Sequence, residues 1–303
     1  MRCSCTAHRS TELIVFDRIL LRGAVPAFIF IWASGFVVAK LAANDAEALS
    51  FLCFRYLGVI ALMLVLALIG RAKWPNTRDA FHIAIAGILI QAVYLGGVWV
   101  AVRMGLAAGL ASLIVNLQPV LTACLFFLTN ETLTRRQVLG IVIGFAGVVI
   151  VLSGKLINAS FVLVPVLLCV LALLGSTLGV IYQKRFVPQF DLRSGQVIQF
   201  SASLIVTLPL ALIFESFAVR WSTDVIIAWF WSVFVLSGCG ISLMFYLLRT
   251  GSLTKLTSTM YLVPALTAVM AWVLFRETLS WSVIAGMMVT LAGVYLVVNQ
   301  PRK

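Results

Sequence analysis

The stretch PVLTACLFFLTNETL occupies residues 119–133 of the chain, and PALTAVMAWVLFRETL occupies residues 264–279. Both begin with Pro-x-Leu-Thr-Ala, both end with Glu-Thr-Leu, and their first prolines lie 145 positions apart. Apolar segments share some leucine and valine by chance, but chance accounts poorly for the matching proline and Glu-Thr-Leu. The pattern predicts that one structural unit occurs twice in the 303 residues.

The similarity extends over more than forty residues. Residues 109–123 align with residues 254–268, and further on Gly140 aligns with Gly286. The glycines of the GIVIGFAG stretch are expected to allow close helix packing. We therefore divide the chain into an N-terminal cytoplasmic tail at 1–22, a first repeat at 23–153 and a second repeat at 154–303.

The composition is that of a membrane protein. The chain is 62% hydrophobic and 11% charged, whereas a soluble chain is about 45–50% apolar and about 25% charged. Apolar runs of about 17–25 residues are long enough to cross a bilayer as helices. We predict an all-α integral membrane protein with about ten transmembrane helices. The predicted spans are 24–43, 49–69, 80–101, 106–128, 137–153, 161–182, 195–215, 225–248, 254–275 and 282–299.

The basic residues predict the orientation of these spans. With the N-terminus in the cytoplasm, 16 of the 22 lysines and arginines fall in cytoplasmic segments and 5 fall outside. Cytoplasmic loops carry such an excess, so the split predicts an even number of spans with both termini inside. The net charge of +12 does not indicate nucleic-acid binding, because the basic residues form small clusters between apolar runs.

Five spans in each repeat have a topological consequence. Because five is odd, the second copy must enter the membrane from the opposite side. Such inverted repeats are frequent in secondary transporters, where the substrate site lies near the midplane between the copies. The pattern favours a pathway that opens alternately to either side of the membrane.

Four stretches resemble a known family: WASGFVVAK (32–40), FRYLGV (54–59), MGLAAGLASLIVNLQPVLTA (104–123) and NETLTRRQVLGIVIGFAGVVIV (130–151). They are similar to the EamA-type branch of the drug/metabolite transporter superfamily, over essentially the whole chain after residue 23. The resemblance implies a ten-helix, basket-like carrier with a central cavity, in the bacterial cytoplasmic membrane. Known members include exporters of amino acids and other metabolites, but the substrate does not carry over from the resemblance.

The repeat selects candidate binding residues in the fourth and ninth spans. Ser112, Asn116 and Pro119 share one helical face at spacings of four and three. The corresponding residues of the second copy are Thr257, Tyr261 and Pro264. We expect the polar residues to line the cavity and the prolines to interrupt the helices, with helix packing as the alternative role. Gln118 lies on the opposite face in this projection, so it is expected to pack.

Other spans add further candidates. Gln91 and Tyr94 share a face of the third span, and Trp32 lies in the first span, which the resemblance places beside the pathway. Arg55 lies within the second span, where a guanidinium could bind a carboxylate. We expect instead that Arg55 extends to the outer interface or pairs with a helix C-terminus.

The remaining chemistry of the sequence is sparse. All ten carboxylates fall in predicted loops, the tail or span ends, so the spans offer no acidic proton relay and facilitated diffusion or exchange is favoured. No enzyme motif occurs, and the CxC of the tail has only His8 nearby, so we expect no enzyme, cofactor or metal site. We predict a carrier of amino acids or related small metabolites, working in export. A channel or a non-transporting membrane assembly protein is the alternative, and the oligomeric state stays open.

Overall fold

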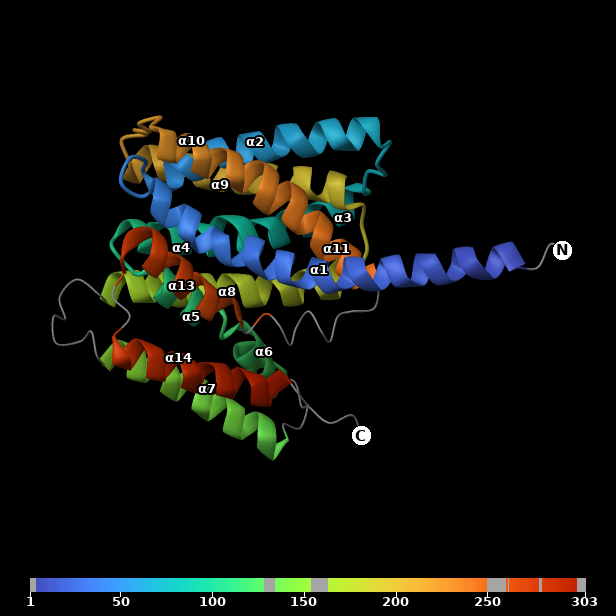
Figure 1. Ribbon diagram of the computed structural model, residues 1–303. Coiled ribbons are helices and arrows are strands. Elements are labelled where there is room, and N and C mark those ends of the chain that lie inside the picture. Colours follow the sequence, from blue (N-terminus) through green and yellow to red (C-terminus); the bar gives the residue numbers. More distant parts are fainter. Residues whose placement is uncertain are drawn as a thin grey trace.

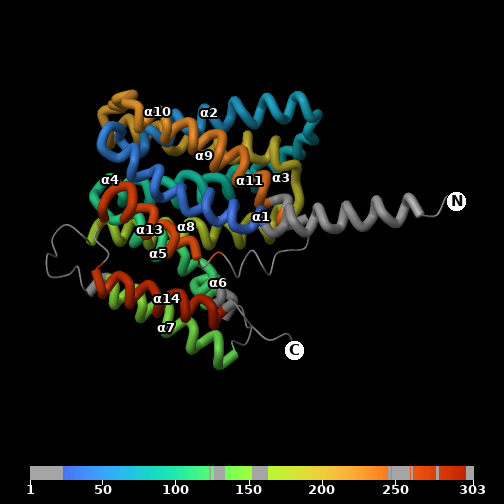
Figure 2. The backbone as a smooth tube through the Cα atoms, viewed as in Figure 1, coloured from blue at the N-terminus to red at the C-terminus, as the bar shows by residue number. Residues whose placement is uncertain are grey.

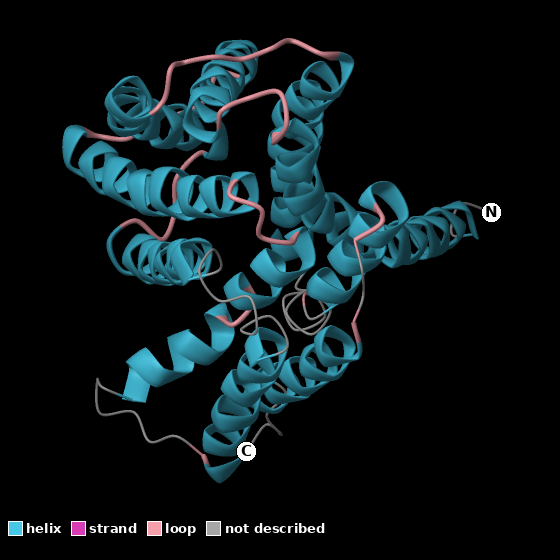
Figure 3. Ribbon diagram, turned by 90° about the vertical axis from the view of Figure 1, so that its left-hand side faces the viewer, coloured by secondary structure: helices cyan, strands magenta, loops and turns pink. Residues whose placement is uncertain are grey.

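The computed structural model describes residues 4–127, 134–153, 163–249, 260, 262–277 and 280–298, and in these ranges every regular element is a helix (Figures 1 and 3). The first half contains α1 (Ser4–Ala42), α2 (Ala48–Ile69), α3 (Thr77–Gly87), η1 (Ile88–Leu95), α4 (Gly96–Arg103), α5 (Ala108–Val115), α6 (Gln118–Phe127) and α7 (Arg135–Ser153). The second half contains α8 (Leu163–Phe186), α9 (Leu192–Phe214), α10 (Thr223–Phe230), η3 (Trp231–Gly240), α11 (Ile241–Arg249), α13 (Leu262–Phe275) and α14 (Trp281–Val298).

Six of these helical stretches are long and apolar enough to cross a membrane. They are Gly23–Ala42, Ala48–Ile69, Thr77–Arg103, Leu163–Phe186, Leu192–Phe214 and Thr223–Met244. Three shorter apolar helices follow at Ala108–Thr122, Leu262–Phe275 and Trp281–Val297. The expectation of an all-helical chain built from apolar helices is confirmed, while ten spans and their orientation stay a prediction.

The surface of the bundle carries large apolar side chains. Ile205, Leu212 and Ile213 on α9 are 73%, 62% and 71% exposed, and Leu68 and Ile69 on α2 are also exposed. Exposed apolar surface of this extent is unfavourable in water but suits contact with lipid tails.

Helix α1 extends beyond the predicted first span at 24–43. The helix begins at Ser4, while its membrane-length apolar part begins at Gly23, so the cytoplasmic tail at 1–22 stays a prediction. The physical reason is local, because the sequence between Ser4 and Gly23 contains no proline or glycine that would end a helix.

The predicted span at 106–128 is interrupted in its middle. Helix α5 ends at Val115, Asn116 and Leu117 form a turn, and α6 starts at Gln118. Pro119 sits in the first turn of α6, where its missing N–H costs nothing. The interruption predicted from Pro119 is present, but it falls just before the proline because a proline fits the start of a helix better than its interior.

Two other spans contain π-helical segments. Segment η1 joins α3 to α4, and η3 joins α10 to α11. Shifted by the repeat offset, residues 88–95 correspond to residues 233–240, so both segments lie in the third span of a predicted repeat. π-Helical segments are rare in proteins, and those that do occur are often found at functional sites.

Helices α7 and α14 pack directly along one another at one side of the bundle (Figure 1). A Cβ atom added to Gly293 would overlap the backbone of Gly144, and one added to Gly147 would overlap the backbone of Thr290. The absence of side chains at these positions lets the two backbones approach closely. The close packing expected of the GIVIGFAG glycines is therefore confirmed.

We predict that Gly293→Ala destabilises the protein by about 1–3 kcal/mol, because the added methyl group overpacks this interface. Thermal unfolding of the purified protein in detergent measures the change. Gly144→Ala is the matched control, since its Cβ would meet Leu117 and Val120 at an ordinary 3.5 Å. Equal unfolding temperatures for the two variants would contradict the proposed packing.

Candidate functional site

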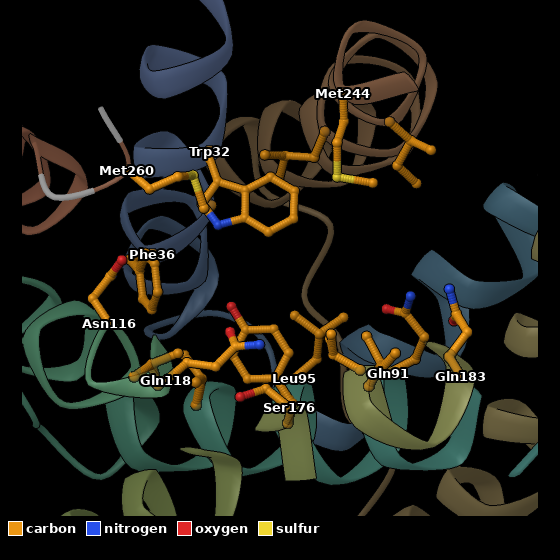
Figure 4. A pocket seen from close by; sticks show the side chains of 18 of the residues that line it. Trp32, Phe36, Gln91, Leu95, Asn116, Gln118, Ser176, Gln183, Met244 and Met260 are labelled. Atoms are coloured by element: carbon orange, nitrogen blue, oxygen red, sulfur yellow. The ribbon is translucent and has the colours of Figure 1, made fainter. Parts of the chain in front are cut away.

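A cavity of about 700 Å³ lies inside the helical bundle. Its walls come from α1, α2, η1, α4, the α5–α6 break, α8, α9, η3 and α11, with contributions from the ends of α7 and α14. Figure 4 shows Trp32 extending from α1 into this space, with Asn116 and Gln118 on one side and Gln91 and Gln183 on the other.

The lining is rich in amide side chains. Seven of the lining residues carry an amide, namely Gln91, Asn116, Gln118, Gln137, Gln183, Gln196 and Gln199. Arg55 is the single charged side chain among the lining residues that the structure describes. The rest of the wall is mostly apolar and aromatic, as is usual for sites that bind small molecules.

Among the described residues, the cavity lining reaches toward one end of the bundle. At this end, which we call the open end, lie the turns at 70–76 and 187–191, and lining residues such as Gln137 and Val297 come from helix termini there. Figure 2 shows that α14 finishes at the same end. The opposite end, which we call the sealed end, carries the turns at 43–47, 104–107 and 215–222, none of which lines the cavity.

An ion pair joins three helices at the sealed end. The Lys40 ammonium at the end of α1 pairs with the Glu277 carboxylate, which follows α13. Glu277 also accepts a hydrogen bond of 3.4 Å from the backbone N–H of Ala108, the first residue of α5. The helix N-terminus carries a partial positive charge, so both it and the Lys40 ammonium attract the Glu277 carboxylate.

Close packing lies beneath this ion pair. The Cα of Gly109 in α5 faces Ala268 of α13, so that a Cβ on Gly109 would be only 3.1 Å from the Cβ of Ala268. On the cavity side, the rings of Trp99 and Phe51 stack with their centroids 4.6 Å apart. Together, these contacts hold α1, α5 and α13 close to one another at the sealed end.

Further carboxylates tie the sealed-end turns together. Glu47 accepts hydrogen bonds of 3.0 Å from the N–H of Ala218 and from the Ser216 hydroxyl. Burial raises the pKa of the Glu47 carboxyl, but these hydrogen bonds and the nearby Arg103 outweigh burial and hold the pKa below its usual value. Arg220 pairs with Asp45 at 3.6 Å.

Several predicted binding residues lie on the cavity wall. Trp32, Gln91, Tyr94, Asn116 and Pro119 all line it. Asn116 directly follows α5, and its amide donates a 2.7 Å hydrogen bond to the backbone carbonyl of Ser112. The backbone carbonyl of Gln91 accepts a 2.7 Å hydrogen bond from the Tyr56 hydroxyl, which fixes η1 against α2.

Other predicted residues lie elsewhere. Ser112 is fully buried away from the cavity lining and donates to the Gly109 carbonyl at 2.9 Å, so its hydroxyl is satisfied within its own helix. Pro264 is buried in the first turn of α13 and is also absent from the lining. Thr257 and Tyr261 fall outside the described residues.

Arg55 does not extend to the outer interface, contrary to our expectation. Its side chain is only 6% exposed, and it lines the cavity. The sequence projection missed its direction because a position along the span does not tell whether the residue faces lipid or the interior.

Gln118 was assigned to the wrong face for a physical reason. A continuous helix would rotate by about 100° per residue and turn Gln118 away from Asn116. The turn at Asn116 and Leu117 breaks this rotation, and both amides line the cavity. The proline was the signal that a single helical projection does not apply here.

A glutamine cluster near the open end was missed by the sequence analysis. The Gln199 amide donates to Gln183 at 2.8 Å, and the Gln196 amide lies 3.5 Å from the Gln199 oxygen. The Gln196 side-chain oxygen is buried without a hydrogen-bond partner. The sequence did contain a signal for this cluster, because Gln183 directly follows the predicted span 161–182 and Gln196 and Gln199 lie within the predicted span 195–215.

The wall offers hydrogen-bonding groups that suit binding of a solute. Among the residues that the structure describes, no group of three histidine, cysteine or acidic residues could hold a metal ion. Amides donate and accept hydrogen bonds without changing charge, so they suit the reversible recognition of a polar solute.

Comparison with known proteins gives a consistent result. The sequence profile of the EamA-like transporter family matches residues 23–153 and again residues 163–299. The chain is 27% identical to the uncharacterized inner membrane transporter YedA of Escherichia coli K12, covering 93% of this chain and 94% of YedA. It is 26% identical to the uncharacterized transporter YvbV of Bacillus subtilis, covering 89% and 88%.

The chain is also similar to a protein named as a probable efflux pump and to a protein of known structure. A probable amino-acid metabolite efflux pump of Salmonella typhimurium is 24% identical, with 88% of this chain and 91% of the pump covered. A solved crystal structure of a protein shares the fold with a TM-score of 0.59, at 17% identity, covering 90% of this chain and 95% of that chain.

We predict that a cysteine at position 116 is accessible to water while one at position 112 is not, because Asn116 lines the cavity and Ser112 is fully buried. Asn116→Cys and Ser112→Cys are compared in a background whose six native cysteines are alanine. Labelling by a small charged thiol reagent in detergent measures the difference, which we expect to exceed about tenfold in rate. Equal labelling rates for the two cysteines would contradict the placement of Asn116 on the cavity wall.

Proposed function

Since the chain belongs to the EamA-like transporter family and is a multi-pass protein of the cytoplasmic membrane, we propose that it is a secondary carrier that exports small metabolites, amino acids or related compounds, by alternating access. The observation that carries this proposal is the amide-lined cavity, which is open toward one end of the bundle and sealed at the other. A carrier needs such a one-sided cavity, whereas a conducting channel needs a pathway continuous through both ends.

The proposed architecture is ten spans arranged as two inverted repeats, at 23–153 and 154–303, with both termini in the cytoplasm. Three observations support it: the family profile matches the chain twice, π-helical segments occur at corresponding positions, and α7 packs on α14, its counterpart in the second copy. In this orientation the open end faces the cytoplasm, so that a solute enters the cavity from inside the cell.

The ion pair at the sealed end is the proposed outer closure. Lys40 and Glu277 hold α1, α5 and α13 together in the present state, and outward opening would separate them. The repeat places Lys184 and Glu131 at the corresponding positions of the other copy, although Glu131 lies outside the described residues. We propose that this second pair closes the cytoplasmic side when the outer side opens.

The proposed binding residues are those that line the middle of the cavity. Trp32 offers an aromatic face, while Gln91, Tyr94 and Asn116 offer hydrogen bonds to a polar solute. Thr257 and Tyr261 keep their proposed roles from the repeat alone. The probable amino-acid metabolite efflux pump of Salmonella typhimurium supports the choice of substrate class.

We predict saturable counterflow in proteoliposomes that contain the purified protein and an excess of unlabelled amino acid. Asn116→Ala should raise the half-saturating concentration about two- to tenfold, as expected for the loss of one hydrogen bond. Ser112→Ala is the matched control and should behave as the unaltered protein, because Ser112 lies off the wall. Flux that rises linearly without saturation would contradict a carrier.

We predict that loss of the outer ion pair opens the sealed end more often. Lys40→Met should increase labelling of a Ser176→Cys reporter on the cavity wall by an impermeant thiol reagent added outside. A shift of about 1 kcal/mol between the two states corresponds to roughly fivefold more labelling. Arg220→Met, which removes a surface ion pair at the same end, is the control and should change nothing.

Reversal of the two charges gives a second check. Lys40→Glu combined with Glu277→Lys should restore the low outside labelling, since the pair is rebuilt with opposite polarity. If the Ser176→Cys reporter is already strongly labelled from outside while Lys40 and Glu277 are both present, the proposed orientation is contradicted.

A further inference from the structure

Arg55 occupies an unusual position for a charged side chain. It lies in the second turn of α2, is 94% removed from solvent at 6% exposure, and still contributes to the cavity wall. The surrounding helices are apolar, and a charged group in the membrane interior is costly unless it has a partner.

The described structure gives Arg55 no anionic partner. Its Nε atom is buried without a hydrogen bond, and no carboxylate among the described residues forms an ion pair with it. Tyr56 follows Arg55 in α2 and Tyr94 lines the same cavity, but a phenol is uncharged at neutral pH and does not balance the guanidinium.

Glu215, an acidic residue that contacts the first turn of α2, is already engaged. Glu215 accepts hydrogen bonds from the N–H groups of Leu49 and Ser50, at 2.9 and 2.7 Å, and from the Ser50 hydroxyl at 2.7 Å. These bonds satisfy free N–H groups at the N-terminus of α2. Glu215 is thus held by the helix end and does not pair with Arg55.

We propose that Arg55 binds the carboxylate of the transported solute and thereby selects carboxylate-bearing compounds over organic cations. This inference rests on the proposed carrier function and names the substrate class of its cavity. A guanidinium presents paired N–H donors that match the two oxygens of a carboxylate, and the interaction is strong where water is excluded.

The rest of the wall agrees with this class. Trp32, Phe36, Leu95, Met244 and Met260 offer apolar contact for the body of a solute (Figure 4). A zwitterionic amino acid could place its ammonium group against amide oxygens. No described lining residue carries a carboxylate, so a solute with a positive charge alone would meet Arg55 without any compensating attraction.

The first test measures binding without transport. Thermal unfolding of the purified full-length chain is followed with N-acetyl-L-phenylalanine, N-acetyl-L-leucine or N-acetyl-L-methionine, and with the carboxamide of each. The acids should stabilise the protein at concentrations at least about tenfold lower than the amides do, because each pair differs only in the group that meets Arg55. Equal effects of acid and amide, or no effect of any acid, would overturn the proposal.

Variants assign the preference to Arg55. Arg55→Gln should abolish the difference between acids and amides, whereas Arg55→Lys should retain part of it because the charge remains. Arg193→Gln is the control for loss of a basic residue, since Arg193 pairs with Asp191 at 2.9 Å outside the cavity. If Arg55→Gln does not fold, Arg55→Lys still tests the proposal. Its preference for acids over amides should be smaller than that of the unaltered protein, and an equal preference would count against Arg55.

The second test separates this inference from the proposed function. In counterflow, excess L-phenylalanine should displace labelled L-phenylalanine at least about tenfold better than L-phenylalaninamide or phenethylamine does. Saturable exchange without this preference would keep the carrier and overturn the role of Arg55. Acid-specific stabilisation that depends on Arg55, but no counterflow with any amino acid, would keep the binding site and count against the carrier.

Discussion

The fold depends on one constraint, which is that hydrocarbon offers polar groups no hydrogen-bond partner. Helices satisfy their own backbone, so every regular element of the described chain is a helix. Polar side chains must then meet one another, water or a ligand. The amides of Gln183, Gln196 and Gln199 meet on the cavity wall, and Arg55 faces the same space. A water-accessible cavity in the bundle is the arrangement that lets these residues remain in apolar helices.

Irregular backbone occurs where this cavity lies. The turn at Asn116 and Leu117 and the π-helical segments η1 and η3 each contribute to the wall. An interruption in a span exposes backbone groups that lipid cannot satisfy, so it is tolerated beside a cavity or packed protein. The same interruption brings Asn116 and Gln118 to one surface, which a regular helix would prevent.

The two ends of the bundle differ in how their helices are joined. At the sealed end, Glu277 connects Lys40 to the N-terminus of α5, and Glu47 and Glu215 connect neighbouring turns. At the open end, lining residues continue to helix termini such as Gln137 and Gln183. Because Lys40 and Glu277 are contributed by different copies of the proposed repeat, their contact couples the halves directly. A transport cycle that breaks this contact would therefore move one half relative to the other.

The sequence by itself determined the apolar helices, the repeat and the glycine contact of α7 with α14, because hydropathy and small residues act locally along a helix. The sequence also predicted that Trp32, Gln91, Tyr94 and Asn116 line the cavity, since polar or aromatic residues in apolar spans are few. Only the tertiary structure decided that Arg55 faces the cavity rather than the outer interface, that Gln118 joins the wall and that Ser112 does not. These outcomes depend on how each helix is rotated and interrupted against its neighbours, and that rotation is set by packing between segments far apart in the chain, which a single helical projection does not contain.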